Sequence, residues 1–114
     1  MATIYKICGR AEWQAAEGEG EFRGSPVDNH DGFIHFSTAA QLPETAAKHF
    51  AQQTGLILVA VDDESLGGCL RWEPARGGDL FPHLYAARPL SAVLWLRPLP
   101  DEVDGCRPIA ELEP

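Results

Sequence analysis

The sequence predicts an α+β fold: a single compact domain with two short helices on mostly antiparallel sheets. Two observations predict it. Short runs of alternating or β-branched and aromatic residues recur along the chain, and two Ala-rich segments favour helices. The length of 114 residues allows one hydrophobic core. We therefore expect one globular domain over residues 1–99 and a Pro-rich acidic C-terminal tail over residues 100–114.

The expected strands follow from their apolar residues. The continuous β-branched run Leu56–Val61 predicts a central strand that is buried on both faces. Shorter runs of strand-forming residues predict five further strands. These are Thr3–Cys8, Phe33–Ser37, Leu70–Glu73, His83–Ala86 and Ala92–Leu96.

Two helices are expected between these strands. Residues Ala11–Glu19 have high helix propensity. Pro43 suits a first helical position, and an apolar stripe that includes Ala46 and Phe50 follows it, so a second helix is predicted at Pro43–Gln53. The segment Ser25–Gly32 is dense in turn formers and is expected to be a loop.

The charge balance excludes some classes of partner. Lys and Arg number 9 against 17 Asp and Glu, which gives a net charge of −8. This balance argues against binding duplex nucleic acid through its phosphates and against docking on an anionic membrane. The N-terminus lacks a secretory pattern, and the three cysteines are widely spaced, so we expect a cytoplasmic protein with reduced thiols. The composition, rich in Ala, Gly and Arg, is typical of a bacterial source.

Three predicted strands each carry a polar pair at a spacing of two residues. Because strand side chains alternate between faces, the members of a pair share a face. The pairs are His35 with Ser37, Arg71 with Glu73, and His83 with Tyr85. We expect all six side chains to line one concave surface. The residues expected in the core are Ile34, Phe36, Leu58, Ala60, Trp72 and Leu84.

These polar residue types suit a phosphate- or ribose-bearing ligand. The guanidinium of Arg71 can bind a phosphate at two points, and Glu73 can accept from ribose hydroxyls or act as a base. Histidine can transfer a proton near neutral pH. The alternation is also what any strand with one solvated face shows, so an ordinary strand surface remains the alternative reading.

A metal site is a further alternative. Residues Asp28–Asp31, with His35 and His83, offer oxygen and imidazole ligands. Their spacing matches no recognised zinc motif, so no tightly bound zinc is expected.

Specific motifs resemble a known family. The segments Asp31–Thr38, Arg71–Glu73 and Phe81–Tyr85, together with Gln41 and Ala47–Phe50, resemble the "D-G-F-I-H-x-S" pattern of a small bacterial family, domain of unknown function 952. The resemblance implies an ADP-ribosyltransferase-like fold with a cleft that binds NAD or a related phosphorylated nucleotide. Enzymes of that fold present a His, a Tyr and a Glu from three strands, whereas this chain holds Lys6 where the first-strand His is expected.

Three functions are therefore considered. The first is a nucleotide- or NAD-related transferase or phosphotransferase, with NAD or another nucleotide as substrate and no other cofactor expected. Its catalytic residues would be His35, Glu73 and His83, and its ligand-binding residues Ser37, Gln41, Arg71 and Tyr85. The alternative is a non-catalytic binding module of the same fold. The third is a metal-assisted hydrolase that uses His30, His35 and His83. The expected partner is a small phosphorylated molecule.

Overall fold

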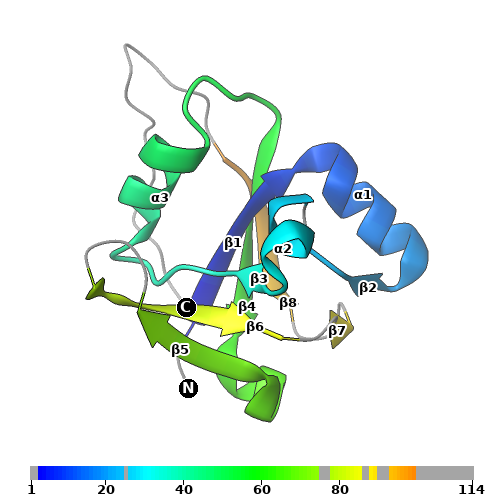
Figure 1. The fold of residues 1–114 in the computed structure, drawn as a ribbon. Helices are drawn as coiled ribbons and strands as arrows, with labels where there is room; N and C mark the ends of the chain where they lie inside the picture. Colours follow the sequence, from blue (N-terminus) through cyan, green and yellow to red (C-terminus); the bar gives the residue numbers. More distant parts are fainter. Residues whose placement is uncertain (1–2, 25, 75–77, 86–87, 90–92, 100–114) are drawn as a thin grey trace.

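The computed structural model describes residues 3–24, 26–74, 78–85, 88–89 and 93–99 (Figure 1). Over these residues the chain forms antiparallel sheets with a few short helices, which confirms the predicted α+β class. The predicted tail over 100–114 lies outside the described residues, as do Ala86 and Ala92 at the ends of two predicted strands. No helix in the described part of the chain is long and apolar enough to span a membrane.

The central sheet contains β1 (Thr3–Gly9), β4 (Leu56–Asp62) and β8 (Val93–Pro98) in the order β1-β4-β8. Strands β1 and β4 pair antiparallel along their whole length, from Thr3 opposite Asp62 to Gly9 opposite Leu56. Every residue of Leu56–Val61 is buried, so the prediction of a strand buried on both faces is confirmed. Side chains of β1 and β4 contribute to two separate apolar clusters.

Two helices cover opposite faces of this sheet (Figure 1). Helix α1 (Arg10–Glu19) follows β1 directly and buries Trp13 and Ala16 in the first cluster. Helix α3 (Leu42–His49) buries Leu42 and Ala46 in the second cluster. Helix α3 is shorter than predicted: it ends at His49, the backbone of Phe50 leaves the helical conformation, and Gln52 has a φ of 64°.

The structure corrects the expected loop at Ser25–Gly32. Residues Pro26–Asp31 form a short helix, α2, and Asp63–Cys69 form a 3-10 helix, η1, so the described residues contain more than the two predicted helices. Helix α2 ends where the N–H groups of Gly32 and Phe33 both donate to the carbonyl of Asp28. Gly32 adopts a φ of 87°, which glycine tolerates without strain.

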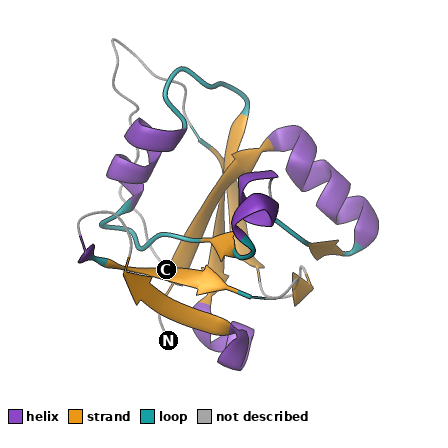
Figure 2. Ribbon diagram, viewed as in Figure 1, coloured by secondary structure: helices purple, strands orange, loops and turns teal. Residues whose placement is uncertain are grey.

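A second sheet contains β3 (Ile34–His35), β6 (Leu80–Leu84) and β5 (Leu70–Pro74) in the order β3-β6-β5 (Figure 2). One cross-strand row is apolar, Ile34, Leu84 and Leu70, and it packs on the first cluster. The two sheets are joined by a bridge in which Tyr5 and Ser37 exchange backbone hydrogen bonds of 2.8 Å. A short pair, β2 (Glu21–Phe22) with β7 (Arg88–Pro89), forms a third sheet.

The predicted core is confirmed at five of its six positions. Ile34, Phe36, Leu58, Ala60 and Leu84 are buried. The prediction for Trp72 is wrong, since its side chain is 41% exposed. Strand β5 is the edge of its sheet. Leu70, its first residue, packs on the first cluster, whereas Trp72 lies two residues further along, opposite Pro82. Alternation placed Trp72 on the same face as Leu70, but the first cluster, as the described residues form it, contacts Leu70 and does not include Trp72.

Candidate functional site

A polar row crosses the other face of the second sheet. His35, His83 and Arg71 lie directly opposite one another on β3, β6 and β5. Because side chains directly opposite each other share a face of the sheet, the three project to the same side. The ring centroids of His35 and His83 are 5.7 Å apart. Glu73 lies two residues after Arg71, and Tyr85 two residues after His83, so five of the six predicted polar side chains come together here.

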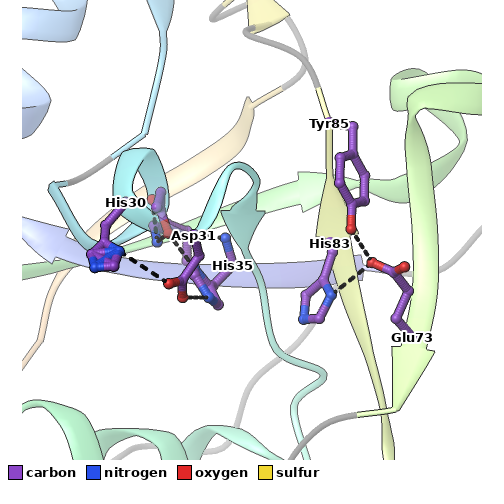
Figure 3. Close-up of polar contacts among 8 residues, drawn as sticks. His30, Asp31, His35, Glu73, His83 and Tyr85 are labelled. Atoms are coloured by element: carbon purple, nitrogen blue, oxygen red, sulfur yellow. Dashed lines mark hydrogen bonds and ion pairs between the residues drawn. The ribbon is translucent and has the colours of Figure 1, made fainter.

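Glu73 is held by two neighbours (Figure 3). Its Oε1 atom accepts hydrogen bonds from His83 Nδ1 at 3.0 Å and from the Tyr85 hydroxyl at 2.5 Å. The bond from Tyr85, followed by that from His83, lowers the pKa of the Glu73 carboxyl below its ordinary value. The same bond raises the pKa of Tyr85. At neutral pH Glu73 is therefore an oriented anion and Tyr85 a neutral donor.

Glu73 also lines an open hollow. Its side chain is 36% exposed, and within the described residues Oε2 makes no hydrogen bond. The hollow, of about 390 Å³, is lined by Gly68, Cys69, Arg71, Glu73 and Tyr85. The Arg71 guanidinium carbon lies 5.7 Å from the centre of the Tyr85 ring and, among described residues, forms no ion pair. An open carboxylate oxygen and an uncommitted guanidinium thus share one hollow.

His35 lies between two carboxylates. Its Nδ1 atom is 2.5 Å from Asp28 Oδ1, and its Nε2 atom is 3.0 Å from Asp31 Oδ2. The backbone N–H of His35 also donates to Asp28 Oδ1, at 3.0 Å. Both ring nitrogens of His35 therefore lie within hydrogen-bond distance of a carboxylate oxygen.

Asp28, which contacts His35, also forms a buried ion pair with Lys6. Lys6 Nζ lies 2.7 Å from Asp28 Oδ2 and 2.9 Å from Oδ1, and Asp28 is 1% exposed. Sequence reasoning missed this pair because Asp28 was read as a turn residue. A signal was present, however: Lys6 shares the core-facing side of β1 with Ile4 and Cys8, and a buried lysine requires a partner.

Phe33 is a second residue that sequence reasoning missed. Its ring centroid lies 4.1 Å from that of His83, 4.6 Å from that of His35 and 5.3 Å from that of Tyr85. It lies two residues before His35 in the predicted strand Phe33–Ser37, so alternation places both on one face, a signal that the prediction did not use. Phe33 therefore packs against three of the predicted site residues at once.

Two predicted ligand-binding residues lie apart from this group. Ser37 is 4% exposed, and its hydroxyl is 3.0 Å from the Thr45 hydroxyl on α3. Gln41 donates to the carbonyl of Leu80 at 2.8 Å and accepts from the N–H of Thr38 at 3.0 Å. Both side chains connect structural elements, so only the other five predicted residues converge on the polar face.

The residues considered as metal ligands are engaged elsewhere. His83 bonds to Glu73 and His35 to the two aspartates, while His30 is largely exposed, with Nδ1 3.8 Å from Asp31 Oδ1. Within the described ranges, no three His, Cys, Asp or Glu side chains are grouped so as to hold a metal ion.

A polar face on an antiparallel sheet, with an oriented carboxylate and a guanidinium lining one hollow, defines a small α+β protein with a candidate ligand site. The sequence model of the family described as "Protein of unknown function (DUF952)" matches residues 7–96, so the chain belongs to this family. The resemblance given by the Asp31–Thr38 and Phe81–Tyr85 motifs is thereby confirmed. No curated protein matches the chain.

Solved structures of one bacterial protein are similar to this chain. The crystal structure of protein CC0527 from Caulobacter crescentus has 50% sequence identity and a TM-score of 0.89, with 94% of each chain covered. The solution NMR structure of CC0527 has 51% identity and a TM-score of 0.82, covering 93% of this chain and 91% of that one.

Proposed function

We propose that this chain is a nucleotide- or NAD-related transferase or phosphotransferase with an ADP-ribosyltransferase-like cleft, acting in the hollow beside Glu73. One observation carries the proposal. The Glu73 carboxylate is fixed through one oxygen by His83 and Tyr85, its other oxygen has no hydrogen bond within the described residues, and its side chain lines a hollow together with Arg71. A carboxylate held in one orientation beside a guanidinium suits a substrate that carries both hydroxyl groups and phosphate.

In this proposal Arg71 binds the phosphate of the ligand and Glu73 binds its ribose. In a chain of net charge −8, an anionic ligand needs a local cation, and Arg71 supplies a guanidinium that can make two parallel bonds to a phosphate. Glu73 Oε2 would accept a hydrogen bond from a ribose hydroxyl.

The transfer step follows from the charge of Glu73. The bond between ribose C1′ and the leaving group breaks, and its electron pair departs with that group. Positive charge develops on the ribose, and the Glu73 anion stabilises it. The oxygen of an incoming hydroxyl group then bonds to C1′, and its proton passes to Glu73. His83 and Tyr85 act as positioning residues that hold the carboxylate at one orientation.

A specific observation favours the second candidate, a non-catalytic binding module of the same fold. Lys6 stands where the resemblance leads us to expect a histidine, and its ammonium group is buried against Asp28. Lys6 therefore cannot reach a ligand in the hollow without breaking that ion pair. A module of this kind would bind the same ligands through Arg71 without turning them over.

The test combines binding and turnover with NAD and ADP-ribose. Dissociation constants are measured by calorimetry, and products by chromatography with mass detection. The Arg71→Lys variant should weaken binding about tenfold or more, because lysine cannot reproduce two-point contact. The Glu73→Gln variant should bind nearly as well as the original chain and lose turnover.

Matched controls use exposed residues of the same type on α1. Arg10→Lys and Glu17→Gln should leave both measurements unchanged, since neither residue lines the hollow. Binding without turnover in the original chain would favour the binding module. If neither NAD nor ADP-ribose binds at millimolar concentration, the proposed function is wrong.

A further inference from the structure

A second hollow lies next to the first, and Tyr85 lines both. This hollow has a volume of about 210 Å³. Phe33 and Tyr85 provide aromatic walls, and Ile34 and Leu84 provide apolar surface. The polar lining residues are Arg23, Asp28 and Asn29. None of the charged residues that surround the first hollow, Arg71 or Glu73, lines the second. The two hollows thus offer different chemistry on either side of one tyrosine.

The aromatic wall is continuous. The ring centroids of Phe33 and Tyr85 are 5.3 Å apart with an interplanar angle of 39°, so the two rings touch. Phe33 is held in turn by the ring of His83, at 4.1 Å between centroids. The wall is therefore fixed by the same side chains that orient Glu73. An ordered aromatic surface of this kind favours stacking of a flat ring.

The polar side chains leave one uncommitted group. Asn29 is exposed on α2 and forms no hydrogen bond with any described residue. Its amide presents both donors and an acceptor, the combination that pairs with the edge of a heteroaromatic ring. The Nε atom of Arg23 donates a hydrogen bond to Glu21 Oε1 at 2.9 Å.

From these features we infer that the second hollow binds the heteroaromatic base of a nucleotide whose phosphate lies at Arg71. The base stacks on Phe33 and Tyr85, and Asn29 contacts its polar edge. The inference rests on the proposed function for the phosphate, and it adds the place in the fold that recognises the base of the nucleotide. It also assigns binding roles to Phe33 and Asn29, residues outside the predicted site.

The experiment compares ligands that differ only by the base. Dissociation constants are measured by calorimetry for ribose 5-phosphate, for the four common ribonucleoside 5′-monophosphates and for nicotinamide mononucleotide. At least one mononucleotide should bind about tenfold or more tightly than ribose 5-phosphate, as expected for one stacked base. Phe33→Leu should remove most of this ratio, and Asn29→Ala should change the ranking among the bases.

Because Phe33 also packs on His83, the effect of Phe33→Leu is expressed as the ratio of the mononucleotide affinity to the ribose 5-phosphate affinity. The variant should weaken the mononucleotide about tenfold more than it weakens ribose 5-phosphate, whereas a general disturbance of the first hollow would weaken both alike. Gln14→Ala, an exposed change on α1, is the control and should change neither affinity. Arg71→Lys should weaken all phosphorylated ligands by the same factor.

The outcomes separate the two proposals. Equal affinities for ribose 5-phosphate and every mononucleotide would overturn the base subsite and leave the proposed function standing. If a mononucleotide binds more tightly than ribose 5-phosphate while Arg71→Lys leaves every affinity unchanged, the base subsite is supported and the phosphate role of Arg71 is contradicted. If no ligand of the set binds, both proposals are wrong.

Discussion

Asp28 and Glu73 each hold the Nδ1 atom of a histidine in the same cross-strand row, yet their surroundings differ. Asp28 is 1% exposed, and both of its oxygens contact the ammonium group of Lys6. Glu73 is partly exposed and keeps one oxygen free of described partners. The difference indicates a division of roles: a carboxylate with every oxygen engaged stabilises the fold, and one with an open oxygen is available to a ligand.

The largest expected effect comes from removing the buried carboxylate. Asp28→Ala leaves Lys6 buried without a partner, and breaking a buried ion pair in this way costs about 3–5 kcal/mol of unfolding free energy. Glu73→Gln removes a carboxylate that is partly solvated, so the unfolding free energy should stay close to its original value. Urea denaturation followed by circular dichroism measures both variants.

A double variant provides the control for this comparison. Replacing the pair by apolar residues, as in Lys6→Met with Asp28→Leu, removes both buried charges together and should recover the greater part of the loss. If Asp28→Ala alone costs less than about 1 kcal/mol, the value typical of an exposed pair, the buried network is not what stabilises this part of the fold.

The two thiols near these carboxylates give a second measurement. Cys8 is buried near Lys6 and Asp28, and burial raises the pKa of its thiol to about 12. Cys69 is half-buried and lines the hollow beside Glu73. Because the thiolate is the reactive form, iodoacetamide at pH 8 should modify Cys69 at least about tenfold faster than Cys8.

Mass spectrometry of a Cys106→Ser background follows the two sites separately. In urea both thiols should react at similar rates, which shows that the folded structure produces the difference. Equal rates in the folded protein would contradict the burial of Cys8.

The smallest expected effect is on titration. Tyr85→Phe removes the largest contribution that lowers the Glu73 pKa, so that pKa should rise toward its ordinary value. Glu73→Gln should in turn lower the pKa of Tyr85 toward its ordinary value. Carboxyl ¹³C shifts follow Glu73, and phenolate absorbance follows Tyr85. An unchanged Glu73 pKa in Tyr85→Phe would mean that the two side chains are not hydrogen-bonded in solution.

The sign of the pH effect on stability follows from the same shift. A carboxyl whose pKa is lowered on folding stabilises the folded state at pH values above its unfolded pKa. That contribution is lost as the pH falls through the folded pKa. The Tyr85→Phe variant should therefore lose less stability on acidification than the original chain.

Strand alternation was sufficient to predict most of the polar face. The period of two is a property of the extended backbone, so it placed Arg71 with Glu73 and His83 with Tyr85 without knowledge of the fold. It failed at Ser37 because that residue follows the last paired residue of β3 and instead bridges to Tyr5 of the central sheet. It also failed at Trp72, since alternation gives the face of a residue but not whether another layer covers that face.

The missing parts of the site depend on contacts between distant segments. The six residues of α2 are mostly turn formers, and a helix that short is marginal without tertiary contacts. Its buried Asp28 bonds to Lys6 of β1 and to His35 of β3, which local propensity does not include. Alternation places Phe33 on the face of His35, but its contacts with the rings of His83 and Tyr85 follow only from the pairing of β3 with β6.

The pairing of β1 with β4 has a consequence for how the chain folds. It joins the first described residues to the middle of the chain, with Thr3 opposite Asp62, whereas β5 and β6 pair across a short connection, with Pro74 opposite Leu80. Closing a long loop costs more entropy than closing a short one, so the β5–β6 hairpin can form early and the central sheet late. During synthesis β1 leaves the ribosome well before β4 exists, and its apolar side chains stay exposed to other chains throughout that interval.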